Sequence, residues 1–115
     1  MGTIQNKYLG VLEEIALKNK YTKWYIQLCR RDPKSSGYVE EHHILPRSFK
    51  LGGLKDPANL VILTAREHYV AHLLLTKMFD GQRQYKMLAA AFMMASRTRM
   101  AGSHTYQRLR LRKFD

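Results

Sequence analysis

Four of the five histidines fall within residues 40–72, and their spacing constrains how that stretch can fold. His42 and His43 are adjacent, whereas His68 and His72 are four positions apart. Residues four apart lie one above the other on the same face of a helix. Two imidazoles on one helix face can bind a single metal ion. The spacing therefore predicts a helix with two candidate metal ligands on one side.

Two short apolar segments precede this helix and are typical of strands. Residues 38–44 contain β-branched side chains and end before Pro46, and residues 59–63 form a second apolar run. A glycine pair and an Asp-Pro dipeptide lie between them, so the connection must turn. If His42 faces the helix, His43 faces away unless the strand ends there, because adjacent strand residues point to opposite faces. We therefore expect a local break at this pair.

A capping-box pattern marks the start of the histidine helix. Thr64 is followed three positions later by Glu67, and the apolar stripe continues to residue 79, where Asp80 and Gly81 indicate the end. Apolar residues at helical spacing predict further helices over residues 3–18, 21–31 and 85–99.

These motifs occur in an order that resembles the HNH endonucleases. The order is His-His-Ile-x-Pro, a Gly-Gly turn, Asp-x-x-Asn-Leu-Val, a strand ending in Thr, and His-x-x-x-His. The longer segment around the histidine helix, Leu-Thr-Ala-Arg-Glu-His-Tyr-Val-Ala-His, is most similar to the free-standing HNH homing endonucleases of large bacteriophages. The resemblance is close over residues 38–79 and looser over residues 7–31. It implies an α+β, helix-rich single domain with a ββα-metal (HNH, His-Me finger) core around one divalent ion. The expected parts of this domain, residues 1–115, are a helical N-terminal part (1–37), the ββα-metal core (38–80), and a helix with a basic tail (81–115).

The resemblance also implies roles for individual residues. His42, His68 and His72 would be the metal ligands, and His43 would be the general base, since imidazole can take a proton from water near neutral pH. Asn59 would orient His43 through a hydrogen bond; in family members with an acidic first ligand it binds metal instead, and taken alone it would be a turn residue. Imidazoles suit zinc and nickel, so these ions are expected to bind tightly, whereas magnesium or manganese is expected to support activity.

Two features around the histidines remain open. A carboxylate often accepts the second imidazole N–H of a metal-binding histidine. Solvated surface charge is the alternative, and the sequence does not decide whether any of the nearby glutamates plays this part: Glu40, Glu41 and Glu67. For the helix pair, the alternative is an ordinary amphipathic helix whose histidines share the apolar face.

The charge distribution favours a polyanionic partner, and the resemblance to HNH endonucleases implies that this partner is double-stranded DNA. The net charge is +11, and basic residues outnumber acidic ones seven to three in residues 1–37 and eight to one in residues 81–115, against five to five in between. Basic flanks suit a phosphate backbone, where each neutralised phosphate releases counterions. A solvated basic surface is the alternative, and for Arg66 a helix-surface ion pair. The candidate DNA contacts are Arg66, Arg47, Lys50, Arg30, Arg31, Arg108, Arg110, Arg112 and Lys113.

Composition excludes disulfide-stabilised and membrane-spanning proteins. Cys29 is the only cysteine, so no intramolecular disulfide can form, and we expect it to be a small core residue. Trp24 is expected in the core between two helices, although aromatics among basic residues can also stack on bases. The longest apolar run, residues 87–95, is too short to span a membrane, and no signal peptide is evident. With the phage resemblance, this predicts a protein of the bacterial host cytoplasm with no membrane association and no small-molecule cofactor.

Two rival functions remain beside the predicted endonuclease. One is a basic DNA-binding module with a structural zinc site and no catalysis, which a closed four-ligand zinc site would support. The other, ranked last, is a toxin-like nuclease with an immunity partner. For the endonuclease, one set of histidines predicts an enzyme that mainly nicks one strand. The absence of a heptad run predicts a monomer.

Overall fold

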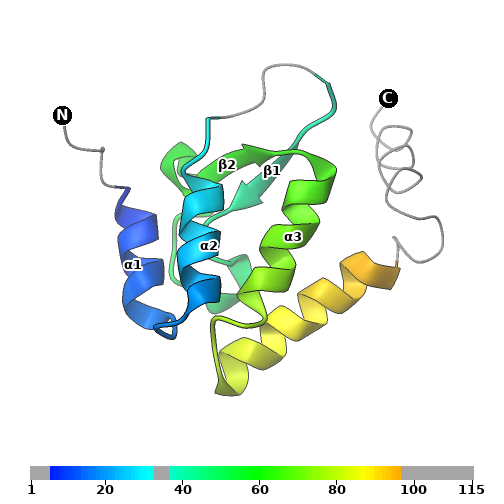
Figure 1. Cartoon of the computed structure of the whole chain (residues 1–115). Coiled ribbons are helices and arrows are strands. Elements are labelled where there is room, and N and C mark those ends of the chain that lie inside the picture. Colours follow the sequence, from blue (N-terminus) through cyan, green and yellow to red (C-terminus); the bar gives the residue numbers. More distant parts are fainter. Residues whose placement is uncertain (1–5, 33–36, 97–115) are drawn as a thin grey trace.

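Helices surround one small antiparallel sheet in the computed structural model, which describes residues 6–32 and 37–96 (Figure 1). This arrangement confirms the predicted α+β, helix-rich fold. The elements in chain order are α1 (Lys7–Ile15), α2 (Lys20–Cys29), β1 (Glu40–His43), β2 (Leu60–Leu63), α3 (Ala65–Leu75) and a helix that the structure describes over residues 81–96. Two short 3₁₀ turns, Arg47–Phe49 and Pro57–Asn59, lie in the connection between the strands.

The two N-terminal helices begin at asparagine caps. The Asn6 side chain accepts hydrogen bonds from the first-turn N–H groups of α1, and the Asn19 side chain does the same for α2. These caps place the helix starts at Lys7 and Lys20. The predicted helix over residues 3–18 is therefore shorter, and its first three residues lie outside the described ones.

The sheet pairs β1 with β2 in a register that places the histidine pair at the end of β1. His42 lies opposite Val61, and His43 lies opposite Leu60. The strand runs without interruption through both histidines, so the break that we expected at the pair comes directly after it. Normal strand alternation therefore holds: His42 is buried, and His43 is half-buried on the other face.

Helix α3 starts as the capping box predicts. The Thr64 hydroxyl accepts a hydrogen bond from the Glu67 N–H at 3.1 Å, and the Glu67 carboxylate accepts one from the Thr64 N–H at 2.9 Å. Together the two contacts satisfy backbone donors that the first turn of a helix leaves free.

The end of α3 differs from the prediction. The helix stops at Leu75 rather than at residue 79, because the next three N–H groups bond to carbonyls three positions back and tighten the chain into a turn. The Thr76 hydroxyl also donates to the Leu73 carbonyl. Met78 and Phe79 continue the apolar stripe and are buried by this turn. The last helix then begins at residue 81, four residues earlier than expected.

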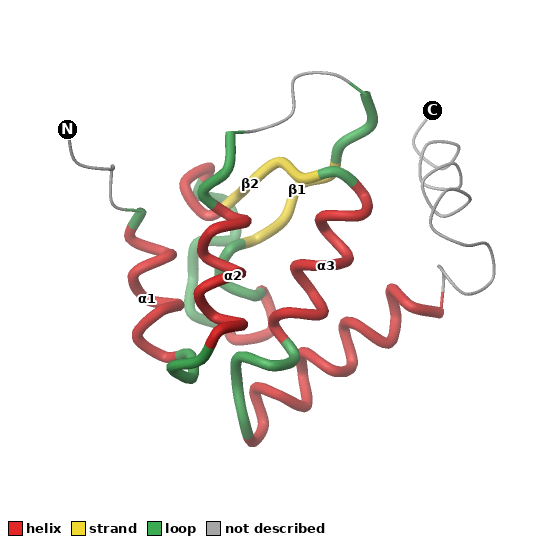
Figure 2. Tube along the Cα trace, in the orientation of Figure 1, coloured by secondary structure: helices red, strands yellow, loops and turns green. Residues whose placement is uncertain are grey.

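The core lies between the helices and the sheet. Helix α2 lies between α1 and α3 and packs mainly against α3 (Figure 2). Cys29 is buried, as predicted, but Trp24 is 48% exposed and was wrongly assigned to the interior. Its neighbour Tyr25 is fully buried instead. Met87 and Ala91 are buried and extend the core into the last helix, as their helical spacing predicts. Within the described residues, no helix has the length and apolar character needed to cross a membrane.

Candidate metal centre

Three histidines from two elements converge at one point. His42 comes from β1, and His68 and His72 come from successive turns of α3. One nitrogen of each ring lies within 4.8 Å of the corresponding nitrogens of the other two, and the ring centroids are 5.0–5.2 Å apart. The structure thus brings together the three residues predicted as metal ligands.

Burial favours the neutral, metal-binding form of two of these imidazoles. Loss of solvation lowers the pKa of His42 well below its usual value, and the neighbouring histidines lower it further. Loss of solvation likewise lowers the pKa of His72 to about 4, with a smaller contribution from His68. A neutral imidazole keeps a lone pair on one nitrogen, which is the form that ligates a metal.

Glu40 orients His68. Its carboxylate oxygen lies 2.6 Å from Nδ1 of His68, and it is almost completely buried. Since an ionised carboxylate only accepts, Nδ1 carries a hydrogen and Nε2 is left for a metal. Tyr38 donates its hydroxyl to the other Glu40 oxygen at 2.6 Å. Of the three glutamates that the sequence left open, Glu40 is the one in contact with His68; Tyr38 was not foreseen.

The other two glutamates have different surroundings. Glu67 completes the helix cap and pairs with Arg31 at 3.1 Å, and Glu41 is exposed beside the histidines. An acidic residue at an alternate strand position from His42 is the signal that could have selected Glu40, because residues two apart share a strand face.

Tyr25 is a second buried polar side chain at the cluster that sequence reasoning missed. Its hydroxyl oxygen lies 2.7 Å from Nε2 of His42 and donates to the Ile44 carbonyl at 2.8 Å. Burial raises the pKa of Tyr25 well above its usual value, with Cys29 as a further contributor, so the phenol keeps its proton. In the sequence, Tyr25 is only one of the apolar positions whose spacing predicts a helix over residues 21–31.

His72 supplies the test of whether a metal fits. Its Nδ1 is buried and has no hydrogen-bond partner among the residues that the structure describes. Buried polar atoms are nearly always satisfied, so an unpaired nitrogen in a cluster of imidazoles indicates a missing ligand. Three histidine nitrogens suit a divalent transition ion such as zinc or nickel. The residues present therefore fit a metal.

His43 points away from this cluster. Its Nε2 lies 3.2 Å from the carbonyl oxygen of Leu54, in the connection between the strands. A carbonyl can only accept, so Nε2 carries the hydrogen and Nδ1 keeps a lone pair. His43 is half-buried, which leaves it in reach of water. This geometry suits proton uptake rather than metal binding.

Asn59 does not make the hydrogen bond to His43 that we expected. The side chain is fully buried, and its oxygen accepts from the Leu45 N–H at 2.9 Å. Its nitrogen donates to the Gly53 carbonyl at 3.2 Å. Asn59 is the last residue of the 3₁₀ turn Pro57–Asn59 before β2, and its amide points into the connection between the strands. Gly53 precedes Leu54, whose carbonyl contacts His43, so this side chain acts on His43 through the backbone of the loop.

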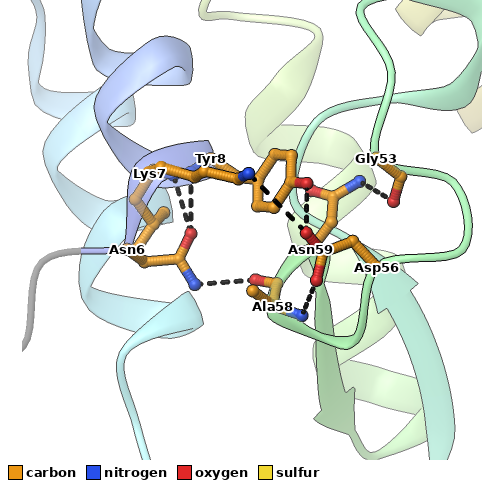
Figure 3. A network of polar contacts seen from close by, with 8 residues as sticks. Asn6, Lys7, Tyr8, Gly53, Asp56, Ala58 and Asn59 are labelled. Atoms are coloured by element: carbon orange, nitrogen blue, oxygen red, sulfur yellow. Dashed lines mark hydrogen bonds and ion pairs between the residues drawn. The ribbon is translucent and has the colours of Figure 1, made fainter.

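Helix α1 supports the same connection from outside (Figure 3). Tyr8 donates its hydroxyl to Asp56, and Asn6 donates to the Ala58 carbonyl at 2.7 Å. The Tyr8 ring also covers Gly53, where an added Cβ would lie 2.5 Å from a ring carbon and where φ is +81°. Only glycine fits this position without strain. The N-terminal helix thus holds the loop that contacts His43.

An open cleft of about 570 Å³ joins the cluster to His43. All four histidines of residues 42–72 line it, together with Arg47 and Lys50 from the connection between the strands. Met87 and Ala90 of the last helix close one side. A charged ligand in this cleft would meet both the imidazoles and two cations.

The other candidate DNA contacts lie elsewhere. Arg30, Arg31 and Arg66 are exposed but do not line the cleft, and Arg31 is paired with Glu67. The four basic residues of the tail lie outside the described residues: Arg108, Arg110, Arg112 and Lys113.

The chain is similar to several proteins of Enterobacteria phage T4. It is 46% identical over 80 residues to probable mobile endonuclease E. The aligned stretch covers 66% of this chain and 52% of that relative. It is 45% identical over 64 residues to probable mobile endonuclease D, covering 50% of this chain and 24% of that relative. With probable mobile endonuclease C the identity is 43% over 81 residues, 70% of this chain and 35% of the relative.

The chain spans about half the length of the first of these relatives and a smaller share of the other two. No protein-family model matches the chain. No solved structure matches it either.

Proposed function

We propose that this protein is an HNH endonuclease that hydrolyses DNA phosphodiester bonds with the help of one divalent metal ion. The observation that carries the proposal is the convergence of His42, His68 and His72 in a cleft that also contains His43. Similarity to proteins named probable mobile endonucleases supports the same conclusion.

The metal would be held by the three clustered histidines. Bound there, a divalent ion would polarise the scissile phosphate and stabilise the leaving oxygen. The two imidazoles with lowered pKa values remain neutral at physiological pH, and Glu40 turns the third so that Nε2 faces the cluster. The protonation state and orientation of these ligands would thus be set before an ion binds.

His43 would act as the general base. Nδ1 takes a proton from the attacking water, whose oxygen bonds to phosphorus as the bond to the leaving oxygen breaks. The Leu54 carbonyl accepts the Nε2 hydrogen, so it fixes the ring and favours the positive charge that the ring gains. Asn59 is a positioning residue in this scheme, because its side chain bonds to the backbone of Leu45 and to that of Gly53, the residue before Leu54.

DNA would approach over the cleft. Arg47 and Lys50 line it and would contact phosphates near the cut, since each is exposed at the rim. The further contacts proposed from the sequence are Arg30, Arg31, Arg66, Arg108, Arg110, Arg112 and Lys113. Each neutralised phosphate adds about 0.9 to the slope of log K against log salt on duplex DNA. Replacing Arg47 and Lys50 with Ala should therefore weaken binding and flatten that slope.

One active site per chain positions one phosphate. The sequence contains one set of these histidines, so the proposed enzyme, of the phage homing type, mainly nicks one strand. It would act as a monomer, since the sequence has no heptad run that would indicate a dimer. Magnesium or manganese would support turnover, whereas zinc or nickel would bind tightly to the imidazoles.

Cleavage of supercoiled plasmid with a panel of divalent ions tests this function. Open circles should appear first and linear DNA later, and a chelator should stop the reaction. His68→Ala and His72→Ala should each weaken zinc binding measured by calorimetry. DNA binding without cleavage under every ion, together with tightly held zinc, would instead indicate a DNA-binding module with structural zinc.

A further inference from the structure

Tyr25 connects the N-terminal part of the chain to the histidine cluster. It lies on α2 and is fully buried. Its hydroxyl oxygen is within hydrogen-bond distance of two atoms of the β1 region, Nε2 of His42 at 2.7 Å and the Ile44 carbonyl oxygen at 2.8 Å. A buried hydroxyl that bridges a candidate metal ligand and a backbone carbonyl has a defined donor and acceptor pattern.

The pattern follows from counting hydrogens. A phenol has one hydrogen to donate, and a carbonyl oxygen can only accept. The Tyr25 hydrogen must therefore go to Ile44, because two acceptor oxygens 2.8 Å apart would otherwise repel each other. The phenol oxygen then has only lone pairs to offer His42. Both contacts are satisfied when Nε2 of His42 carries a hydrogen and donates it to Tyr25.

We propose that Tyr25 is a positioning residue that holds His42 in the Nε2–H tautomer and so presents its Nδ1 to the metal ion. Assigning a metal to Nδ1 rests on the proposed function, whereas the tautomer itself does not. A neutral imidazole with a hydrogen on Nε2 has its lone pair on Nδ1. The hydrogen bond to the other ring nitrogen is what sets the orientation of a metal-ligating histidine.

The three ligands then differ in how they are held. Glu40, in the same strand as His42, fixes His68 through Nδ1. Tyr25, from a separate helix, fixes His42 through Nε2. His72 has an unpaired buried Nδ1 and is positioned by α3 and its packing. Helix α2 therefore contributes directly to the geometry of the site.

NMR of the metal-free full chain tests the proposal. Long-range proton–nitrogen correlations of the ¹⁵N-labelled protein report which ring nitrogen of His42 carries the hydrogen. The wild type should show the Nε2–H tautomer. Tyr25→Phe removes only the hydroxyl, so His42 should shift toward a mixture of tautomers, and zinc affinity by calorimetry should fall by about 10–100-fold.

Tyr21→Phe is the matched control. It makes the same change on the same helix, at a ring that packs edge-on against Trp24. It should leave both the His42 tautomer and zinc affinity unchanged.

An Nδ1–H tautomer in the wild type would overturn the proposal, and this result does not depend on how well the variant folds. A folded Tyr25→Phe variant with the wild-type tautomer and zinc affinity would also overturn it. Neither measurement uses DNA, so a failure of the nuclease assignment would appear separately, as absence of cleavage by a protein with normal tautomer and metal binding.

Discussion

The two faces of β1 hold adjacent histidines by different means. On the inner face, His42 is buried and is held by the side chain of Tyr25. On the outer face, His43 is half-buried and is held by the backbone carbonyl of Leu54. The inner site depends on packing between α2, α3 and β1, whereas the outer one depends on a loop braced by α1. One strand therefore carries two sites, and a substitution that disrupts one of them should leave the other intact.

This difference follows from the chemistry proposed for each face. A metal ligand must stay neutral and keep one geometry, and burial achieves both. A general base must exchange protons with water, so it cannot be fully enclosed. Strand alternation supplies both environments from consecutive residues.

The largest expected effect separates the two faces directly. His43→Ala should reduce cleavage by about 10²–10⁴-fold, because it removes the proposed base. Zinc affinity should remain unchanged, since His43 is outside the cluster of ligand nitrogens. Single-turnover cleavage and calorimetry on the same preparation measure the two quantities. Cleavage within about tenfold of wild type would contradict the role of His43.

The loop on the outer face can be tested through its two glycines. Gly52→Ala should cost about 1–2 kcal/mol, because φ is +88° there and the space is open. Gly53→Ala has a similar backbone penalty and also meets the Tyr8 ring, which should add about 1–3 kcal/mol of overpacking. Urea unfolding measures both.

The Gly53 variant should also cleave more slowly than the Gly52 variant with little change in zinc affinity. Equal losses of stability in the two variants would mean that Tyr8 does not restrain the loop.

A carboxylate pair tests the inner face. Glu40→Ala should lower zinc affinity by about 10–100-fold, because it removes the acceptor for Nδ1 of His68. Glu41→Ala removes the same charge from the next residue, which is exposed, and serves as the control. Calorimetry should show a much smaller change for the control. Equal losses in the two variants would point to general electrostatics rather than to the orientation of His68.

The smallest expected effect concerns the contact between α1 and the loop. The hydrogen bond from Tyr8 holds the pKa of Asp56 below its usual value of 3.8. A lowered carboxyl pKa contributes stability above pH 3.8 that is lost as the pH falls through the folded-state pKa. The difference in unfolding free energy between wild type and Tyr8→Phe should therefore shrink in acid. It should be small throughout because the carboxylate is near the surface.

Urea titrations from about pH 6 to about pH 3 measure this difference. Phenylalanine keeps the ring, so a difference that stays constant into acid would mean that the Tyr8 hydroxyl acts by some route other than its hydrogen bond to the ionised Asp56 carboxylate.

Short-range signals in the sequence were sufficient for the elements around the site. The Thr64–Glu67 pattern located the start of α3, and the spacing of His68 and His72 placed both on one face. These features depend on hydrogen bonds and side-chain positions within one or two turns, so a local pattern can specify them. The predicted end of α3 was wrong because the apolar stripe continues past the helix, through a turn at Thr76. The packing of Met78 and Phe79 in the core accounts for this turn, and a local pattern does not reveal it.

The sequence by itself determined which residues could bind a metal and on which elements they lie. The tertiary structure decided how those residues are held. Helical spacing could not tell that Tyr25 is enclosed beside His42 while Trp24 is half-exposed, nor that Asn59 bonds to the backbone of Leu45 and Gly53. Partners such as Tyr25 and His42 are far apart in the chain, so only the packing of whole elements brings their polar atoms within hydrogen-bond distance.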